Sequence, residues 1–243
     1  MNFYALIIGT EILNARREDK HFNFIRDELQ KYGHELFASF IIKDDEKLIK
    51  QSFELIKADK SSVLFSFGGI GSTPDDLTRK ISADIFTSKP LVLHKQFKLD
   101  IINKFGDDAY PNRIHMAELP ENSDLLFNPI NNMSGYSLNN KYFFVPGFPE
   151  MAHPMLIEVM KKHFSISKQK FRYTLLANTS EDRLISIMKL LPKHIELSSL
   201  PMFKDNGPIV ELSLSGKDKE EVKGYFNLFV EQLTNTKISF KLI

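Results

Sequence analysis

The chain has 243 residues, which is enough for one large domain or for a large domain with a small one. Its net charge is only +1, so no global field favours nucleic acid or a membrane surface, and neither partner is expected. The absence of cysteine excludes disulfides, thiolate nucleophiles and Cys-ligated metal sites. The N-terminus resembles neither a signal peptide nor a membrane span, so a cytoplasmic location is expected.

Strands and helices alternate in the first third of the chain. Apolar runs bounded by turn residues predict strands, and apolar positions three or four residues apart predict helices. The predicted order is a strand at 3–9, a helix at 18–32, a strand at 34–42, a helix capped by Asp44 or Asp45, a strand at 61–67 and a helix with Pro74 in its first turn. This order predicts an α/β layered fold with a mainly parallel sheet.

The rest of the chain divides into an irregular middle and a separate tail. Residues 88–140 are rich in Asn, Pro and Gly, and only a helix at 94–105 is predicted there. A strand at 141–151 then runs into a Pro-Gly-x-Pro turn, and a helix follows to about residue 163. The tail predicts a strand at 171–177, a helix at 180–191, strands at 195–202 and 209–215, an amphipathic helix and a last strand at 238–242. We therefore expect a first domain at 1–165 and a small α+β module at 170–243.

The stretch FSFGGIGSTPDDLTR at 65–79 carries the strongest chemical signal. Gly68, Gly69 and Gly71 follow a buried strand, and glycine lets a backbone turn sharply and lets a ligand approach the amide groups. Ligands of open α/β sheets lie outside the carboxyl ends of the strands, and a helix N-terminus there binds anions. The loop therefore predicts a phosphate or pyrophosphate site, to which Ser72 and Thr73 add hydroxyl donors.

Asp75 and Asp76 in the same loop need a separate explanation. Carboxylates beside a phosphate repel it unless a cation intervenes, so a divalent metal such as Mg²⁺, held by one of them, is expected. The alternative is structural, because aspartates near a helix start also cap amide groups. The loop lacks the lysine of a Walker A motif and does not match G-x-G-x-x-G.

Four segments in order resemble one family. GG-x-G-x-x-x-x-D-x-T at the end of a strand is similar to the signature of the MoaB/MogA-like molybdopterin-binding superfamily, and GGIGSTPDDLTR most resembles the N-terminal domain of the competence/damage-inducible CinA proteins. IIGTEIL at 7–13, the segment NRIHMAELPENSDLLFNPINNMSGYSL and FFVPGFPEM agree with further motifs of that domain. The resemblance spans about residues 3–162. The tail is similar to the KH-like module of CinA, whereas the C-terminal deamidase domain of CinA has no counterpart in these residues.

The resemblance implies a three-layer α/β/α domain that acts on a phosphoanhydride. CinA-type domains are associated with metal-dependent hydrolysis of the pyrophosphate of ADP-ribose, with Mg²⁺, Mn²⁺ or Co²⁺ as the metal. The alternatives are adenylyl transfer to molybdopterin, as in the MoaB/MogA branch, and a non-catalytic nucleotide- or pterin-binding module. Relatives form dimers or trimers, so a homo-oligomer is expected.

The resemblance implies roles for individual residues, according to their positions in the family motifs. Asp76 falls on the family aspartate and is expected to hold metal or water, and Asp75 is its CinA-like neighbour. Glu11 matches the acidic residue of the first loop and is expected to contact the metal. The remaining residues are expected to bind phosphate or nucleotide or to line the site: Gly68, Gly69, Gly71, Ser72, Thr73, Thr78, Arg113, Pro146, Gly147 and Pro149.

The sequence departs from the family motifs at two places. Thr10 stands where the family motif has a carboxylate, which is expected to weaken metal binding or to alter the substrate. The second loop, PGFPEM, is one residue shorter than in CinA before its Glu-Met pair. Elsewhere, the histidines show no zinc-binding spacing, and the tail lacks the G-x-x-G loop with which a KH domain clamps RNA.

Overall fold

The computed structural model describes residues 1–164, 170–204 and 207–243, and it divides into two compact units. The first unit is Met1–Ile166 and the second is Ser167–Ile243. Among the described residues, no helix is both long and apolar enough to cross a membrane.

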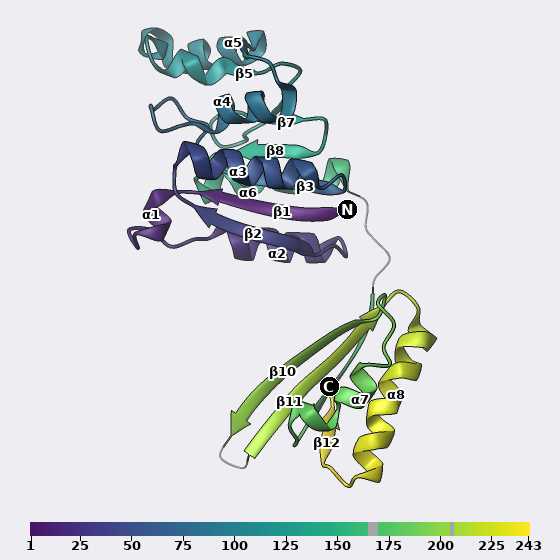
Figure 1. The fold of residues 1–243 in the computed structure, drawn as a ribbon. Helices are drawn as coiled ribbons and strands as arrows, with labels where there is room; N and C mark the ends of the chain where they lie inside the picture. The colour runs from purple at the N-terminus through teal and green to yellow at the C-terminus, as the bar shows by residue number, and fades with distance from the viewer. Residues whose placement is uncertain (165–169, 205–206) are drawn as a thin grey trace. The chain divides into compact units, whose positions relative to one another are not determined.

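A six-stranded mixed sheet forms the centre of the first unit (Figure 1). Its strands, in spatial order, are β2 (Leu36–Ile42), β1 (Asn2–Ile8), β3 (Ser62–Phe67), β8 (Tyr142–Val145), β7 (Gly135–Leu138) and β6 (Asp124–Leu126). The first four are parallel, and β7 and β6 are antiparallel additions at one edge. Strands β1, β3 and β8 are buried along almost their whole length, as continuous apolar runs predict.

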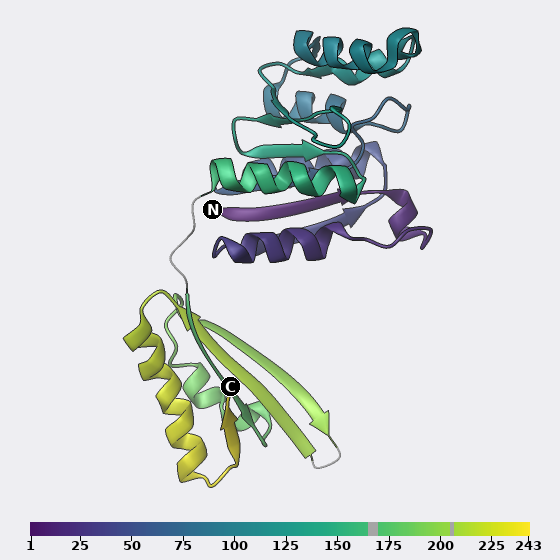
Figure 2. The ribbon, with the colours of Figure 1, turned by 180° about the vertical axis from the view of Figure 1, so that it is seen from behind.

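Helices cover both faces of this sheet, so the expected three-layer α/β/α fold is confirmed. On one face pack α3 (Glu46–Ala58), α4 (Thr78–Ser82) with the π-helical η1 (Ala83–Thr87), and α5 (Lys95–Phe105). On the other face pack α2 (His21–Lys31) and α6 (Pro149–His163), which lie in front of the sheet in Figure 2. The side chains of β1 alternate between the two cores, since Leu6 belongs to one and Ile7 to the other.

The middle segment is more ordered than its composition suggests. Besides β6 and β7, it contains a two-stranded sheet of β4 (Leu91–Leu93) and β5 (Glu118–Pro120), and 3₁₀ turns η2 (Gly106–Ala109) and η3 (Arg113–Ala117). The prediction of an irregular stretch was wrong for these elements. The strands are only three or four residues long, which is too short for a clear alternating pattern.

The helix after β3 begins later than predicted. It starts at Thr78, and Pro74 lies in the preceding turn instead of in the first helical turn. The reason is hydrogen bonding: the Thr78 amide donates to the Gly69 carbonyl at 3.0 Å, and the Asp76 amide donates to the Thr73 carbonyl. The loop therefore closes on itself before the helix can propagate.

The second unit is a four-stranded antiparallel sheet packed against helices. Its strands, in spatial order, are β10 (Glu196–Lys204), β11 (Gly207–Gly216), β9 (Phe171–Ala177) and β12 (Phe240–Leu242). Helix α8 (Lys219–Asn235) supplies Val222, Phe226, Phe229 and Leu233 to its core. The helix predicted at 180–191 is shorter than expected: a 3₁₀ turn η4 (Glu181–Arg183) and α7 (Ile185–Met188).

Candidate functional site

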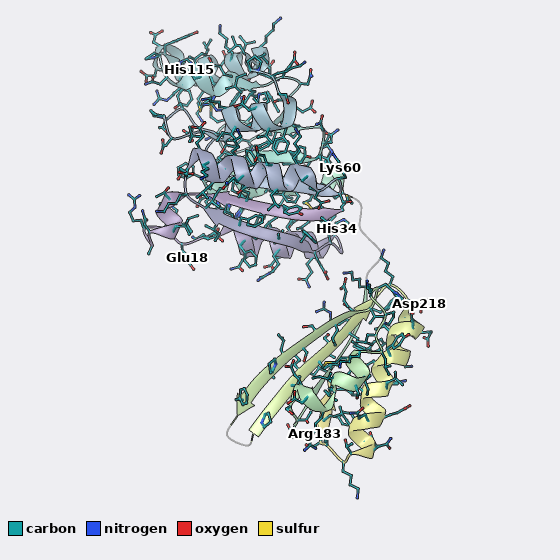
Figure 3. All side chains as sticks on the ribbon, viewed as in Figure 1. Glu18, His34, Lys60, His115, Arg183 and Asp218 are labelled. Carbon is teal, nitrogen blue, oxygen red and sulfur yellow. The ribbon has the colours of Figure 1, made fainter. Side chains whose placement is uncertain are left out.

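A cavity of about 540 Å³ lies at the carboxyl edge of the parallel strands. Part of its wall comes from the segments that directly follow β1, β2, β3 and β8, which is where ligands of open α/β sheets bind. Figure 3 orients this edge: Glu18, beyond the end of β1, lies at the end of the sheet opposite to His34 and Lys60, which precede β2 and β3.

Most of the predicted site residues line this one cavity. They are Glu11, Gly68, Gly69, Gly71, Ser72, Thr73, Asp75, Asp76, Arg113, Pro146 and Gly147. Two predicted residues are not among the lining residues. Thr78 is fully buried beneath the loop, and Pro149 opens helix α6.

The three glycines of the loop are required by close contacts. Gly68 and Gly69 have φ angles of +96° and +67°, in the left-handed region that side chains disfavour. A Cβ on Gly68 would lie 2.3 Å from the Ile8 carbonyl oxygen, and one on Gly71 would lie 2.6 Å from a carboxylate oxygen of Asp76. Any side chain at these positions would therefore displace the loop from β1 or from Asp76.

The carbonyls of this loop are held from below. Thr78 Oγ1 donates to the Gly68 carbonyl at 3.0 Å, the Thr78 amide donates to Gly69, and Arg79 Nη2 donates to Gly71 at 2.7 Å. In a trans peptide the N–H points opposite to the C=O. The amides that follow these carbonyls, those of Gly69, Ile70 and Ser72, therefore point away from Thr78 and Arg79.

Four consecutive amides of the loop have no acceptor among the described residues. Gly69, Ile70, Gly71 and Ser72 all line the cavity, and none of their N–H groups donates to a protein atom there. Buried or semi-buried amides of native proteins are almost always paired with protein, water or ligand. Outward amides that follow residues of positive φ, as those of Gly69 and Ile70 do, form an anion-binding concavity of the kind known from phosphate sites.

The two aspartates of the loop differ in their roles. Asp76 Oδ2 accepts both the Thr73 amide, at 2.8 Å, and the Thr73 hydroxyl, at 2.7 Å. This carboxylate therefore closes the loop with one oxygen and leaves the other available. Asp75 is exposed at the mouth of the cavity. The structural and chemical explanations of the aspartates are therefore compatible, because one residue can serve both.

Asp44 is a cavity residue that was not among the predicted site residues. Its Oδ2 accepts the amide and the hydroxyl of Thr10, at 2.8 and 2.9 Å. The sequence signal was ambiguous because Asp44 and Asp45 both suited the helix cap. The structure assigns the cap to Asp45, whose side chain accepts the Leu48 amide, and so leaves Asp44 facing the first loop. The cavity thus has a carboxylate beside Thr10, although Thr10 itself has none.

The outer wall of the cavity is apolar and carries two arginines. Aromatic and methionine side chains of the middle segment and of the second loop form this wall: Phe97, Phe105, Met116, Met133, Phe148 and Met151. The guanidinium of Arg113 lies 4.7 Å from the ring centre of Phe105, and that of Arg17 lies 5.3 Å from that of Phe148. Arg17 also pairs with Glu11 at 3.8 Å. Such a wall suits a planar ring next to an anionic group.

Two histidines hold the second loop against the first. His21 Nε2 must donate to the Gly147 carbonyl, 3.3 Å away, so its Nδ1 accepts from His153 Nε2 at 3.3 Å. Gly147 in turn packs against Gly68. Burial lowers the pKa of His21, and it lowers that of His153 to about 4 with a smaller contribution from His21. Both rings are therefore neutral at neutral pH, as this chain of hydrogen bonds requires.

The carboxylates of the cavity suit a metal ion that takes most of its ligands from water and substrate. In the part of the chain that the structure describes, no three His, Cys, Asp or Glu side chains are grouped to enclose an ion. Mg²⁺ commonly takes one or two carboxylates and completes its octahedron with water and substrate phosphate. The free oxygen of Asp76 and the carboxylate of Glu11, at the same cavity as the loop amides, fit that mode.

Known proteins are similar to this chain over the first unit, and some of them are similar over the tail as well. Residues 4–165 match the family described as probable molybdopterin binding domain. A putative competence-damage inducible protein of Oceanobacillus iheyensis is 26% identical over 238 residues, covering 91% of this chain and 56% of that protein. A CinA-like protein of Flavobacterium psychrophilum is 28% identical over 250 residues, covering 96% of this chain and 58% of that protein. This chain thus spans a little over half the length of these relatives.

A solved structure shows the same fold. The crystal structure of CinA from Thermoplasma acidophilum, a protein of unknown function, superimposes with a TM-score of 0.61 and 27% sequence identity. The match covers 68% of this chain and all of that one. With the family match over residues 4–165 and the resemblance to CinA-like proteins over most of its length, the chain belongs to the molybdopterin-binding-domain family.

Proposed function

We propose that the first unit binds the pyrophosphate group of a nucleotide at the glycine loop and hydrolyses it with the help of a divalent metal. The observation that carries the proposal is the row of four amides, at Gly69 to Ser72 in the wall of a cavity, that have no acceptor in the part of the chain that the structure describes. Backbone donors of this kind match the oxygens of a phosphate group. ADP-ribose is the substrate that the resemblance to CinA favours.

The charge of the cavity supports a metal. Four carboxylates line it, those of Glu11, Asp44, Asp75 and Asp76, against the two guanidinium groups of Arg17 and Arg113. A pyrophosphate adds further negative charge, and like charges at close range raise the free energy of the complex. A divalent cation held by Asp76 and Glu11 would offset this charge and lower the pKa of a bound water.

The residues of the chain have distinct roles in this proposal. The amides of Gly69 to Ser72 hold a phosphate, Arg113 faces its negative charge, and the apolar wall contacts the ring of the nucleotide. A water oxygen attacks one phosphorus, the bridging P–O bond breaks, and the released phosphate carries away the bonding electron pair. Asp75 is the proposed acceptor of the proton that the water loses, since its carboxylate lines the same cavity.

The test is AMP release from ADP-ribose with Mg²⁺, Mn²⁺ or Co²⁺, compared with Asp76→Ala. We expect the substitution to lower turnover by about 100-fold or more, because it removes a metal ligand and loosens the Thr73 turn. Asp84→Ala is the matched control, since Asp84 is an exposed aspartate outside the cavity. Unchanged turnover in Asp76→Ala would remove the catalytic role of that residue.

A second function is supported by the family match and by the apolar wall. A pterin ring is planar, and the wall of Phe97, Phe105 and Met133 would accept it as well as a nucleobase. The chain would then bind molybdopterin, with or without adenylyl transfer from ATP. Binding of a pterin together with no turnover of ADP-ribose would favour this function over hydrolysis.

A further inference from the structure

Arg79 is a buried charged residue that the proposed chemistry does not use. It follows Thr78 in helix α4, and only 7% of its surface is exposed. No carboxylate of the described residues lies within ion-pairing distance of its guanidinium. Buried arginines are normally paired with an acid, because an isolated buried charge is costly.

The guanidinium instead donates to backbone carbonyls from two segments. Nη2 donates to Gly71 of the glycine loop at 2.7 Å, and Nη1 donates to His115 and, at 3.3 Å, to Glu118. Its Nε is buried and has no hydrogen-bond partner among residues 1–164, 170–204 and 207–243. Arg79 thus joins the loop to the turn η3, which carries Arg113 and Met116 of the cavity wall.

No carboxylate of the described residues therefore pairs with the charge of Arg79. Burial lowers the pKa of Arg79, while Tyr136, Asp76 and Glu118 act in the opposite direction from a distance. A guanidinium nevertheless stays protonated in proteins. Since Gly71 O is its acceptor, the cation lies directly behind the peptide whose N–H, that of Ser72, points the other way.

We propose that Arg79 is a specificity-determining positioning residue that makes the glycine loop prefer ligands with more phosphate charge. It holds the Gly71–Ser72 peptide so that its amide faces the ligand, and its buried positive charge attracts an anion through a medium of low polarity. This inference rests on the proposed function, because it assumes that phosphate binds at the loop. It adds that the number of phosphate charges on the ligand raises the affinity.

The test compares the affinities of ADP and AMP by calorimetry for the full chain with Mg²⁺. For the unmodified protein we expect ADP to bind at least about 10-fold more tightly than AMP, as charge-assisted hydrogen bonds predict. In Arg79→Gln this ratio is expected to fall to about 1–3, and in Arg79→Lys, which keeps the charge, it should stay within about threefold of the original. The contrast should persist in 0.5 M salt, because buried charges are little screened.

Lys80→Gln is the matched control, since it removes an exposed positive charge from the next residue of the same helix. Its ratio should equal that of the unmodified protein at high salt. A merely structural role of Arg79 would weaken ADP and AMP equally, leave the ratio unchanged and overturn the proposal. If Arg79→Gln does not fold, Arg79→Lys provides the test. Loss of the preference for ADP in folded Arg79→Lys, which keeps the positive charge, would overturn the role of charge.

The outcomes separate this inference from the proposed function. No binding of ADP or AMP by the unmodified protein would contradict the proposed function itself. Binding of both with equal affinity would leave phosphate binding intact and overturn only the preference that we assign to Arg79.

Discussion

Two glycines of the cavity loop differ in their surroundings from two glycines of the second unit. In the first unit, Gly68 and Gly69 adopt positive φ angles, and an added Cβ would lie 2.3–2.4 Å from Ile8 or Thr78. In the second unit, Gly207 and Gly224 have no atom within 4 Å of an added Cβ. The first unit therefore uses glycine to bring two segments together around exposed amides, whereas these two glycines of the tail have free space around them.

Buried polar groups show the same difference. The first unit contains Arg79, a buried cation with no acid partner within the described residues, and the buried His21, which is hydrogen-bonded to the partly buried His153 behind the second loop. In the tail, the buried hydroxyls of Ser213 and Ser215 have partners within the unit, Thr174 and Glu196. Among the described residues, the unpartnered Nε of Arg79 lies beneath the loop that lines the cavity, and we place ligand binding at this cavity.

The largest expected effect is on the stability of the tail, and it tests whether the tail contributes to ligand binding. Phe229 is fully buried in the core of the second unit, so Phe229→Ala should lower the stability of that unit by about 3–5 kcal/mol. Calorimetric unfolding should show the tail melting earlier, while the affinity for ADP stays within about twofold, because the site lies in the other unit. A parallel fall in affinity would show that the tail takes part in binding.

The next effect concerns the glycine loop. Gly69→Ala places a Cβ 2.4 Å from Thr78 Oγ1 at a φ of +67°, so we expect ADP to bind about 30-fold more weakly or worse. Gly224→Ala is the matched control in helix α8, and it should stabilise the tail by about 0.5–1 kcal/mol without changing affinity. Titration calorimetry measures the affinity for ADP, and thermal unfolding measures the stability of the tail. Normal ADP binding by Gly69→Ala would contradict the assigned loop geometry.

The smallest expected effect is a pH dependence of stability in the first unit. Burial lowers the pKa of His153 to about 4 and also that of His21, so the unfolded chain binds protons more readily than the fold. Their contribution is complete above the unfolded value of about 6.5 and is lost as the pH falls towards 4. Because His153 is partly exposed, we expect a difference in Tm of only about 2–4 °C between pH 7 and 5.

His153→Gln tests this origin, because glutamine keeps a donor for His21 but does not titrate. The nearby charged groups, Asp19, Glu150 and Arg17, remain in the variant and act as an internal reference. Thermal unfolding should show a smaller loss of Tm between pH 7 and 5 than in the unmodified chain. An identical pH profile would assign the dependence to carboxylates elsewhere.

Local patterns predicted much of the first unit. The apolar runs at 3–9 and 61–67 are buried strands, Asp45 caps α3, and Gly33 follows α2 with a positive φ, all as periodicity and capping rules predict. The antiparallel edge of β6 and β7 escaped prediction. Its pairing depends on contacts with β8, and neither strand is long enough to show a period of its own.

The candidate site was predicted in part. The glycine loop and most of its polar residues do line one cavity, because strand ends of a parallel sheet meet at one edge. Asp44 was missed because it also suited the helix cap, and the methionines of the wall were missed because an apolar side chain in a motif gives no sign that it faces a cavity. Thr78 was expected near the ligand, and the fold places it under the loop as a hydrogen-bond donor to Gly68.

The sequence by itself determined the α/β architecture and the position of the sharp turn after β3, because both depend on local properties: buried apolar runs, and glycines that tolerate positive φ. Only the tertiary structure decided which way the loop amides face. That direction depends on Thr78 and Arg79 holding the carbonyls of Gly68 and Gly71 from below, and on the second loop packing against Gly68. The order of residues cannot show these contacts, since they form only when helix α4, η3 and β8 pack around the end of β3.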